Sequence, residues 1–237
     1  MWTPILFFIQ AVFFMIPHYI WRLAENGLMT FFCYKMKLPE IDENLRNKRV
    51  EQLVKLFSMY KQRNQTYAIL MISVEFLEFV NCLLQFYVLN VAINGQFLTF
   101  GIDYFMSENI VDFIFPKLAK CQFNRFGPGG DLINHDALCL LPLNVLHDKM
   151  FLFAWFYFIF LASASMLLLL YRSICLCSKR LRRMTLQGSS NERTLKSFCD
   201  NAKFGDYIVV CQISKNVDME SFNNFMLQLI SCRNKYV

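Results

Sequence analysis

Apolar positions along this chain gather in three long blocks, and the charged positions gather between them. The first block runs from about Trp2 to Trp21. In the third, Met150 to Tyr171, 22 residues separate the charges of Lys149 and Arg172. A helix of that length reaches about 33 Å at ~1.5 Å per residue, enough to cross a ~30 Å hydrocarbon core. Both blocks therefore predict membrane-spanning helices.

The second block, Thr66 to Ala92, also predicts a span by its hydropathy, although it contains polar side chains. These are Glu75, Glu78, Asn81 and Gln85. On a helix Glu75, Glu78 and Gln85 lie on one side, and Asn81 lies near them. Carboxylates inside a membrane usually face a bundle interior or a water-filled cavity. Two interpretations stay open: a hydrated or subunit-facing stripe, and hydrogen bonding between helices of one subunit. Both require neighbouring helices.

Pro17 interrupts the first block and predicts a kink, since proline removes a backbone hydrogen bond from a helix. A gating hinge and a static bend both fit, and the static bend is favoured. The block lacks the basic start and the small-residue cleavage site of a signal peptide, so we expect it to be retained.

The composition indicates a membrane protein, and the distribution of charge indicates its orientation in the membrane. Hydrophobic residues make up 56% of the chain and charged residues only 18%, against about a quarter charged in soluble domains. Nine Lys and Arg residues lie in 22–65, three in 91–148 and eleven from 172 onward. Because cytoplasmic segments carry the excess of Lys and Arg, the first and last of these segments are expected inside the cell. The predicted order is a span at 1–23, a cytoplasmic loop at 24–65, a span at 66–92, an extracellular loop at 93–149, a span at 150–171 and a cytoplasmic tail at 172–237.

The parts outside the spans predict short elements. Apolar spacing predicts an amphipathic helix over Asp42–Arg63, a short helix near Glu192–Asn201 and a final helix with Asp218 as its N-cap. The apolar run Asp206–Ile213 fits neither helix nor strand firmly. Alternating residues before Gly127-Pro128-Gly129-Gly130 suggest a small hairpin in the outer loop. The predicted fold class is an all-α integral membrane protein with three transmembrane helices, a small extracellular hairpin, and a helical cytoplasmic loop and tail.

The nine cysteines divide by the predicted topology. Cys121 and Cys139 fall in the outer loop, on the oxidising side, where they could pair with each other or with cysteines outside this chain. Cys175 and Cys177 lie just inside the third span, where reduced thiols are favoured over palmitoylation or a metal site.

Catalytic chemistry has no support in the sequence. His135-Asp136 looks like half of a catalytic pair, but no nucleophile motif accompanies it, and hydrogen bonding within a loop is the favoured interpretation. There is no phosphate loop, dinucleotide fingerprint or metalloprotease motif. We therefore predict neither an enzyme nor a cofactor, and no nucleic-acid partner. The net charge of +6 could favour anionic lipid, but topology explains it more simply.

Several stretches, in order along the chain, resemble the innexins, the invertebrate gap-junction proteins. They are Gln10-Ala11, Pro17-His18-Tyr19-Ile20-Trp21, Val74-Glu75-Phe76-Leu77 with Val80-Asn81 and Gln85, Phe115-Pro116-Lys117-Leu118-Ala119-Lys120-Cys121, His135-Asp136-Ala137-Leu138-Cys139, Leu141-Pro142-Leu143-Asn144, Gly205-Asp206-Tyr207 and Ser214-Lys215-Asn216. The resemblance covers nearly the whole chain, and the outer loop makes it specific. It implies a subunit of a plasma-membrane gap-junction channel or hemichannel that passes ions and small molecules. The implied partners are other innexin subunits in a homo- or hetero-oligomer, channels of an apposed cell, and membrane lipid.

The sequence departs from the family pattern at its start and at one polar position. Innexins have four spans, and the three here resemble spans two to four, so an N-terminally truncated subunit is expected that does not form a normal pore alone. In the family, first-loop cysteines bridge to the second loop, and Cys121 and Cys139 would lack those partners. Glu78 stands where the family would have Asn. The alternative hypothesis is a non-conducting membrane interaction protein that modulates full-length innexins, while a receptor-like protein lacks a ligand motif.

Overall fold

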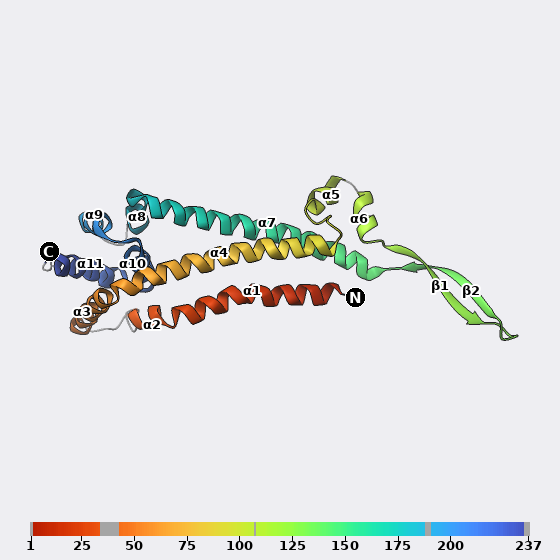
Figure 1. Ribbon diagram of the computed structural model, residues 1–237, viewed down its shortest axis with the longest axis horizontal. Helices are drawn as coiled ribbons and strands as arrows, with labels where there is room; N and C mark the ends of the chain where they lie inside the picture. The colour runs from red at the N-terminus through yellow and green to blue at the C-terminus, as the bar shows by residue number, and fades with distance from the viewer. Residues whose placement is uncertain (1, 34–42, 107, 188–190, 235–237) are drawn as a thin grey trace. The chain divides into compact units, whose positions relative to one another are not determined.

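The structure, a computed structural model, describes residues 2–33, 43–106, 108–187 and 191–234. Along the chain its elements are α1 Thr3–Glu25, α2 Leu28–Phe32, α3 Glu43–Met59, α4 Lys61–Ala92, α5 Phe100–Met106, α6 Glu108–Ile114, β1 Leu118–Phe126, β2 Leu132–Leu140, α7 Pro142–Cys177, α8 Lys179–Leu186, α9 Glu192–Asn201, α10 Phe204–Asn216 and α11 Met219–Asn234 (Figure 1). The chain is mostly helical.

Within the described residues, three helices are long and apolar enough to cross a membrane: α1, α4 and α7. They lie where the three apolar blocks predicted spans. Each is longer than its block, since α4 begins at Lys61 rather than Thr66 and α7 begins at Pro142 rather than Met150. Helix α1 is continuous through Pro17. Extra polar turns beyond a hydrocarbon-length block keep their own backbone hydrogen bonds, so a helix need not end at the membrane surface.

The chain divides into two compact units, and each of the three long helices contributes residues to both. The first unit contains Met1–Phe13 and Phe79–Ala164. Its core is aromatic, with Phe97 and Phe100 almost fully buried and both rings packed among further phenylalanines, Phe86, Phe115 and Phe151. Edge-to-face packing of such rings adds to their burial energy.

Helices α5 and α6, which the sequence did not predict, belong to this unit. Gly101 allows α5 to approach α7, because a Cβ atom there would lie 2.2 Å from Cε3 of Trp155. The same indole donates a hydrogen bond through Nε1 to the Leu98 carbonyl at 3.1 Å. Close backbone approach of this kind requires glycine.

Strands β1 and β2 form an antiparallel hairpin in which Phe126 pairs with Leu132. The connecting residues turn with Gly130 at φ +84°, a left-handed conformation that glycine adopts without strain. The strand and turn pattern predicted for this segment is therefore present, while its extracellular location stays a prediction.

The second unit contains Phe14–Glu78 and Ser165–Val237. Its core is built largely around α10, whose residues Gly205–Cys211 and Ile213 are all buried. Helices α3, α8, α9 and α11 contribute further buried apolar side chains to the same core. A helix that is surrounded on all sides has no polar face, and this explains why the apolar run Asp206–Ile213 showed no helical period.

The elements predicted around this core are present with shifted ends. Helix α3 buries Val50, Leu53, Val54 and Phe57 as predicted, but it ends at Met59, and the rest of the expected helix belongs to α4. Asp42, its predicted first residue, lies outside the described residues. Helix α9 has the predicted bounds, and the backbone N–H of Ser221 donates to Asp218 Oδ2 at 2.9 Å, which confirms the N-cap of α11.

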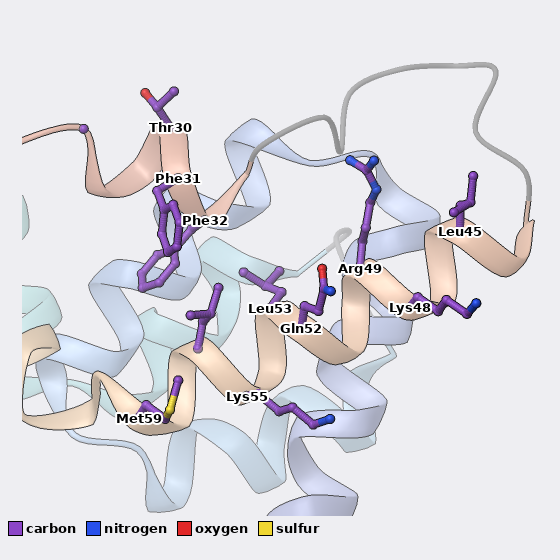
Figure 2. A pocket seen from close by; sticks show the side chains of 12 residues that line it. Thr30, Phe31, Phe32, Leu45, Lys48, Arg49, Gln52, Leu53, Lys55 and Met59 are labelled. Carbon is purple, nitrogen blue, oxygen red and sulfur yellow. The ribbon is translucent and has the colours of Figure 1, made fainter.

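Helices α2 and α3 border a groove of about 1100 Å³ in the second unit. Figure 2 shows Phe31 and Phe32 of α2 projecting toward α3, where Leu53 and Met59 also line the groove.

Candidate functional site

The polar residues predicted on α4 contact α1 within the first unit. Asn81 Nδ2 donates a hydrogen bond to the Phe13 carbonyl at 3.2 Å, and Gln10 Nε2 donates to the Gln85 carbonyl at 3.1 Å. Gln10 and Gln85 are both buried. Because an amide inside a membrane has little water to bond, these contacts tie the two helices together at a fixed register.

The Phe13 carbonyl has a particular need for a donor. In a helix it would accept a hydrogen bond from the N–H of residue 17, but that residue is proline and has no N–H. The amide of Asn81 supplies a donor at this point. The sequence singled out Pro17 and Asn81 separately, and the structure links them through Phe13.

Glu75 contacts α7 within the second unit. Arg172 donates to its carboxylate through Nη2 at 2.8 Å and through Nε at 3.1 and 3.2 Å. The two side chains are only 12% and 15% exposed. A forked contact of this type is stronger than a single hydrogen bond and fixes the orientation of both groups.

The predicted stripe therefore separates into different environments. Glu75 and Asn81 have partners on other helices of the chain, whereas the Gln85 side chain donates to Asn81 Oδ1 within α4 at 3.4 Å. Glu78 is exposed on α4. Its role, and that of the stripe as a whole, stays a prediction. In the sequence Arg172 marks only the end of the third span, although an arginine near the end of a span can pair with an intramembrane carboxylate.

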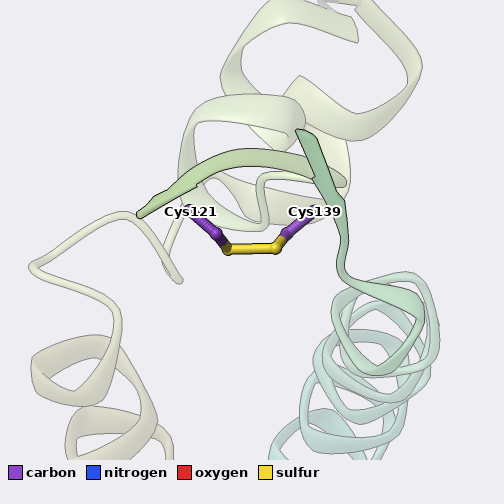
Figure 3. Close-up of a disulfide and its surroundings, with 2 residues drawn as sticks. All are labelled: Cys121 and Cys139. Atoms are coloured by element: carbon purple, nitrogen blue, oxygen red, sulfur yellow. A yellow bond between two sulfur atoms is a disulfide. The ribbon is translucent and has the colours of Figure 1, made fainter. Parts of the chain in front are cut away.

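Cys121 and Cys139 form a disulfide between β1 and β2, with their Cα atoms 5.8 Å apart (Figure 3). The Lys120 ammonium lies 2.7 Å from Asp136 across the same strands, and His135 stacks on Phe123 with ring centroids 5.5 Å apart. Cross-strand pairs and a covalent bridge hold this two-stranded hairpin, which would be marginal alone. The residues His135 and Asp136 take part in strand pairing.

At the other end of α7, Arg182 of α8 contacts the last turn of the helix. Its Nε donates to the Cys175 carbonyl at 2.6 Å and its Nη2 donates to the Leu176 carbonyl. The guanidinium also lies over the rings of Phe204 and Tyr207, 5.3 and 5.8 Å from their centroids. A cation is favourable at a helix C-terminus, where carbonyls lack helical partners. Arg182 thereby connects the end of α7 to α10.

Helix α10 is also joined to the start of α4. Asn64 Nδ2 donates to Asp206 Oδ1 at 3.0 Å, and the Gly205 N–H donates to Gln65 Oε1 at 3.2 Å. Asn64 and Asp206 are both buried. The ends of α4 and α7 thus share one partner, α10, within the second unit.

Buried thiols complete the core of this unit. Burial raises the pKa of Cys211 to about 11, and it also raises the pKa of Cys199. Over the residues that the structure describes, no group of three or more His, Cys, Asp or Glu side chains is placed to hold a metal ion. The polar contacts of this site join helices to one another: α4 to α1, α7 and α10, and α7 to α8.

The innexin family model matches residues 1–232. The chain belongs to the innexin family. Among curated innexins it is 30% identical to innexin inx2 of Drosophila melanogaster over 228 residues, which cover 92% of this chain and 62% of that protein. It is 29% identical to innexin inx2 of Schistocerca americana, covering 92% and 64%, and 32% identical to innexin inx4 of Anopheles gambiae, covering 76% and 49%.

The innexin chain spans about three fifths of the length of the first of these relatives. Innexins are a family of gap-junction channel proteins, not of enzymes, and the three apolar helices agree with a multi-pass protein of the plasma membrane. The resemblance found in the sequence is therefore confirmed at the level of the family.

Proposed function

We propose that this innexin is a subunit of a gap-junction channel or hemichannel that passes ions and small molecules. The family match over residues 1–232 carries the proposal. The structure supports it with apolar helices of spanning length and polar contacts that fix neighbouring helices.

The proposed topology follows the distribution of Lys and Arg. Spans occupy 1–23, 66–92 and 150–171, the segments 24–65 and 172–237 lie in the cytoplasm, and 93–149 lies outside. The disulfide in the hairpin supports the outer location of 93–149, because disulfides persist in oxidising surroundings. The compact packing of α3 with α11 supports a shared compartment for the other two segments.

The proposed partners are further innexin subunits, channels of an apposed cell and membrane lipid. Large apolar side chains remain exposed on α1 and α7, including Phe8, Phe153 and Phe160. In a membrane such surfaces face lipid or a neighbouring helix, and helices of separate subunits can associate through them.

Co-expression with a full-length relative tests the proposal. The tagged chain and Drosophila melanogaster inx2 are expressed singly and together in cells without innexins. Native gels of tag-purified protein report assembly, and paired-cell conductance with dye uptake reports transport. We expect both proteins in one oligomer, and a unitary conductance in co-expressing cells that differs from that of inx2 alone.

Two outcomes oppose the proposal. A tagged chain that purifies without inx2 and leaves conductance unchanged contradicts a channel subunit. If the chain and inx2 form one oligomer whose conductance is suppressed, the chain is not a conducting subunit. That result favours the alternative, a non-conducting protein that modulates full-length innexins. Cells that express only inx2, at a matched surface level, are the control for both measurements.

A further inference from the structure

The groove between α2 and α3 has an apolar base and an apolar rim. Phe32 and Leu53 are buried at its base, whereas Phe31 is 58% exposed and Met59 is 72% exposed. Large apolar side chains that remain exposed around a groove indicate a binding surface rather than a finished core.

Helix α3 presents a second face to this groove. Val50, Leu53, Val54 and Phe57 form the face that enters the core. A different set of lining residues recurs at spacings of three and four, so it forms one stripe along the helix. This stripe is Leu45, Lys48, Gln52, Lys55 and Met59. It has apolar ends and a cationic middle.

The described lining of the groove carries charge of one sign. Among the residues that the structure describes, the twelve that line it include Lys48, Arg49 and Lys55 and no carboxylate. Lys55 also pairs with Glu51, with Nζ 2.8 Å from Oε1, but both groups are more than half exposed. Such a pair in water is weak and leaves the ammonium able to contact another anion. Cations beside exposed apolar groups match an amphiphile with an anionic head.

The groove begins close to the end of a predicted span. Helix α1 ends at Glu25, the chain turns at Gly27 with φ +70°, and α2 begins at Leu28. Trp21, in the last two turns of α1, packs edge-to-face on Tyr67 of α4. Paired aromatic rings of this kind favour the headgroup level of a bilayer, so the groove would lie directly beside the headgroups.

We propose that this groove binds an anionic phospholipid. An acyl chain lies along Phe31 and Met59, and the headgroup with its net negative charge lies between Lys48 and Lys55. The inference rests on the proposed topology, which places the groove at the cytoplasmic surface, where anionic lipids attract basic segments. It requires no pore.

Photo-crosslinking of lipid tests the site. The full chain is placed in nanodiscs of phosphatidylcholine that contain a small fraction of either phosphatidylserine or phosphatidylcholine with a photoreactive acyl chain. Mass spectrometry then maps the crosslinked peptides. We expect phosphatidylserine to label residues 28–32 and 43–59 about thirtyfold more than phosphatidylcholine, the scale expected for two lysines at an anionic headgroup.

Two double variants distinguish binding in the groove from a general effect of the positive charge of the chain. A third double variant tests the apolar part of the groove. The double variant Lys48→Gln/Lys55→Gln should lose the preference for phosphatidylserine. The matched control Lys61→Gln/Arg63→Gln removes the same charge from the start of α4 and should retain it. The variant Leu45→Gln/Met59→Gln changes exposed apolar groups and should lower labelling by both lipids. Circular dichroism checks that every variant is folded.

Three results would overturn the inference: equal labelling by the two lipids, equal losses in the groove variant and its control, or labelling that maps elsewhere. A large excess of inorganic phosphate is a further arm. If it abolishes labelling while sodium chloride at the same ionic strength does not, the site prefers free phosphate to a lipid headgroup. Because nanodiscs expose both leaflets and no conductance is measured, failure of the channel proposal leaves this result intact.

Discussion

Asn81 on α4 donates a hydrogen bond to the carbonyl of Phe13 on α1, with Nδ2 and O 3.2 Å apart. Phe13 lies four residues before Pro17, which has no N–H for that carbonyl. The asparagine thus supplies the bond that the proline removes. A helix in lipid tolerates proline when a neighbouring side chain satisfies the freed carbonyl.

A double-mutant cycle tests this relationship. Asn81→Ala should lower the free energy of unfolding by about 1 kcal/mol, the scale of interhelical hydrogen bonds in membranes. In a Pro17→Ala background the backbone N–H of residue 17 can bond Phe13, so the same substitution should have a smaller effect. Thermal unfolding of the four proteins in detergent gives the coupling energy. Equal losses in both backgrounds would show that the asparagine acts independently of the proline.

The ion pair of Glu75 and Arg172 predicts a different pattern. Glu75→Gln leaves a mostly buried guanidinium without its counter-charge and should lower stability by about 3 kcal/mol. The double substitution Glu75→Met/Arg172→Met removes both charges and should recover most of that loss, because two apolar side chains suit a bilayer. Detergent unfolding compares the three proteins.

An exposed ion pair is the control for this experiment. Glu51 and Lys55 lie one turn apart on α3 and both are more than half exposed. Glu51→Gln should leave the unfolding temperature unchanged, since water already solvates both groups. If the double methionine variant is no more stable than Glu75→Gln, the pair contributes more than charge neutralisation.

The long helices could be predicted from sequence because an apolar block of spanning length is a local signal. The bounds of α9 and the N-cap of α11 at Asp218 could also be predicted. Both rest on local signals, a helical period and a capping residue, that lie within a few positions of the sequence. Helix α10 could not be predicted, because its burial on all sides removes the amphipathic period. Local patterns identify helices that have a polar face and apolar blocks long enough to span a membrane.

The partners of the polar residues could not be predicted either. The sequence showed that Glu75 and Asn81 need neighbours, but the partner depends on how one helix is rotated and shifted against another. Arg172 and the Phe13 carbonyl are 97 and 68 positions away from their respective partners. Such registers are set by packing of the whole bundle rather than by spacing along the chain.

Gly205 should not tolerate a side chain. A Cβ atom there would lie 2.6 Å from both the Asn64 carbonyl oxygen and the Gln65 Cα, and backbone atoms cannot move aside cheaply. Gly205→Ala should lower stability by about 1–3 kcal/mol in thermal unfolding. The control is Gly129→Ala, since the nearest atom to its Cβ is Asp131 Oδ2 at 3.6 Å. Equal melting temperatures of the two variants would contradict the close approach of α10 to α4.

The hairpin disulfide predicts a specific peptide linkage. Non-reducing digestion should yield one species that joins the peptides of Cys121 and Cys139, and Cys121→Ser should leave the other thiol free for alkylation. The bridge closes a sequence separation of 18 residues, for which loop entropy gives about 3 kcal/mol. The variant hairpin should therefore be cut faster by added protease. Cysteines bridged to another chain would instead give larger non-reduced species.

Buried thiols predict a pH dependence. Burial raises the pKa of Cys211 from an ordinary 9.0 to about 11, so at pH 8 only about one thiol in a thousand is the reactive thiolate. Maleimide should modify exposed Cys232 readily in the folded chain and Cys211 only after unfolding. Mass spectrometry of the labelled peptides measures both rates. Comparable labelling of the two thiols at pH 8 would contradict the packing of α10.

The same pKa fixes the sign of a stability change. The folded chain favours the neutral Cys211 thiol, so its contribution is complete below the ordinary pKa of 9.0 and is lost as pH rises through about 11. The unfolding temperature of the chain should fall across this range. The unfolding temperature of Cys211→Ala should fall less steeply, because this variant has no thiol at position 211 to ionise. Tyr207, whose pKa is also raised by burial, interacts with Cys211, so the comparison measures the ionisation of the pair. Parallel curves for the two proteins would mean that the thiol ionises equally easily in the folded and unfolded chains.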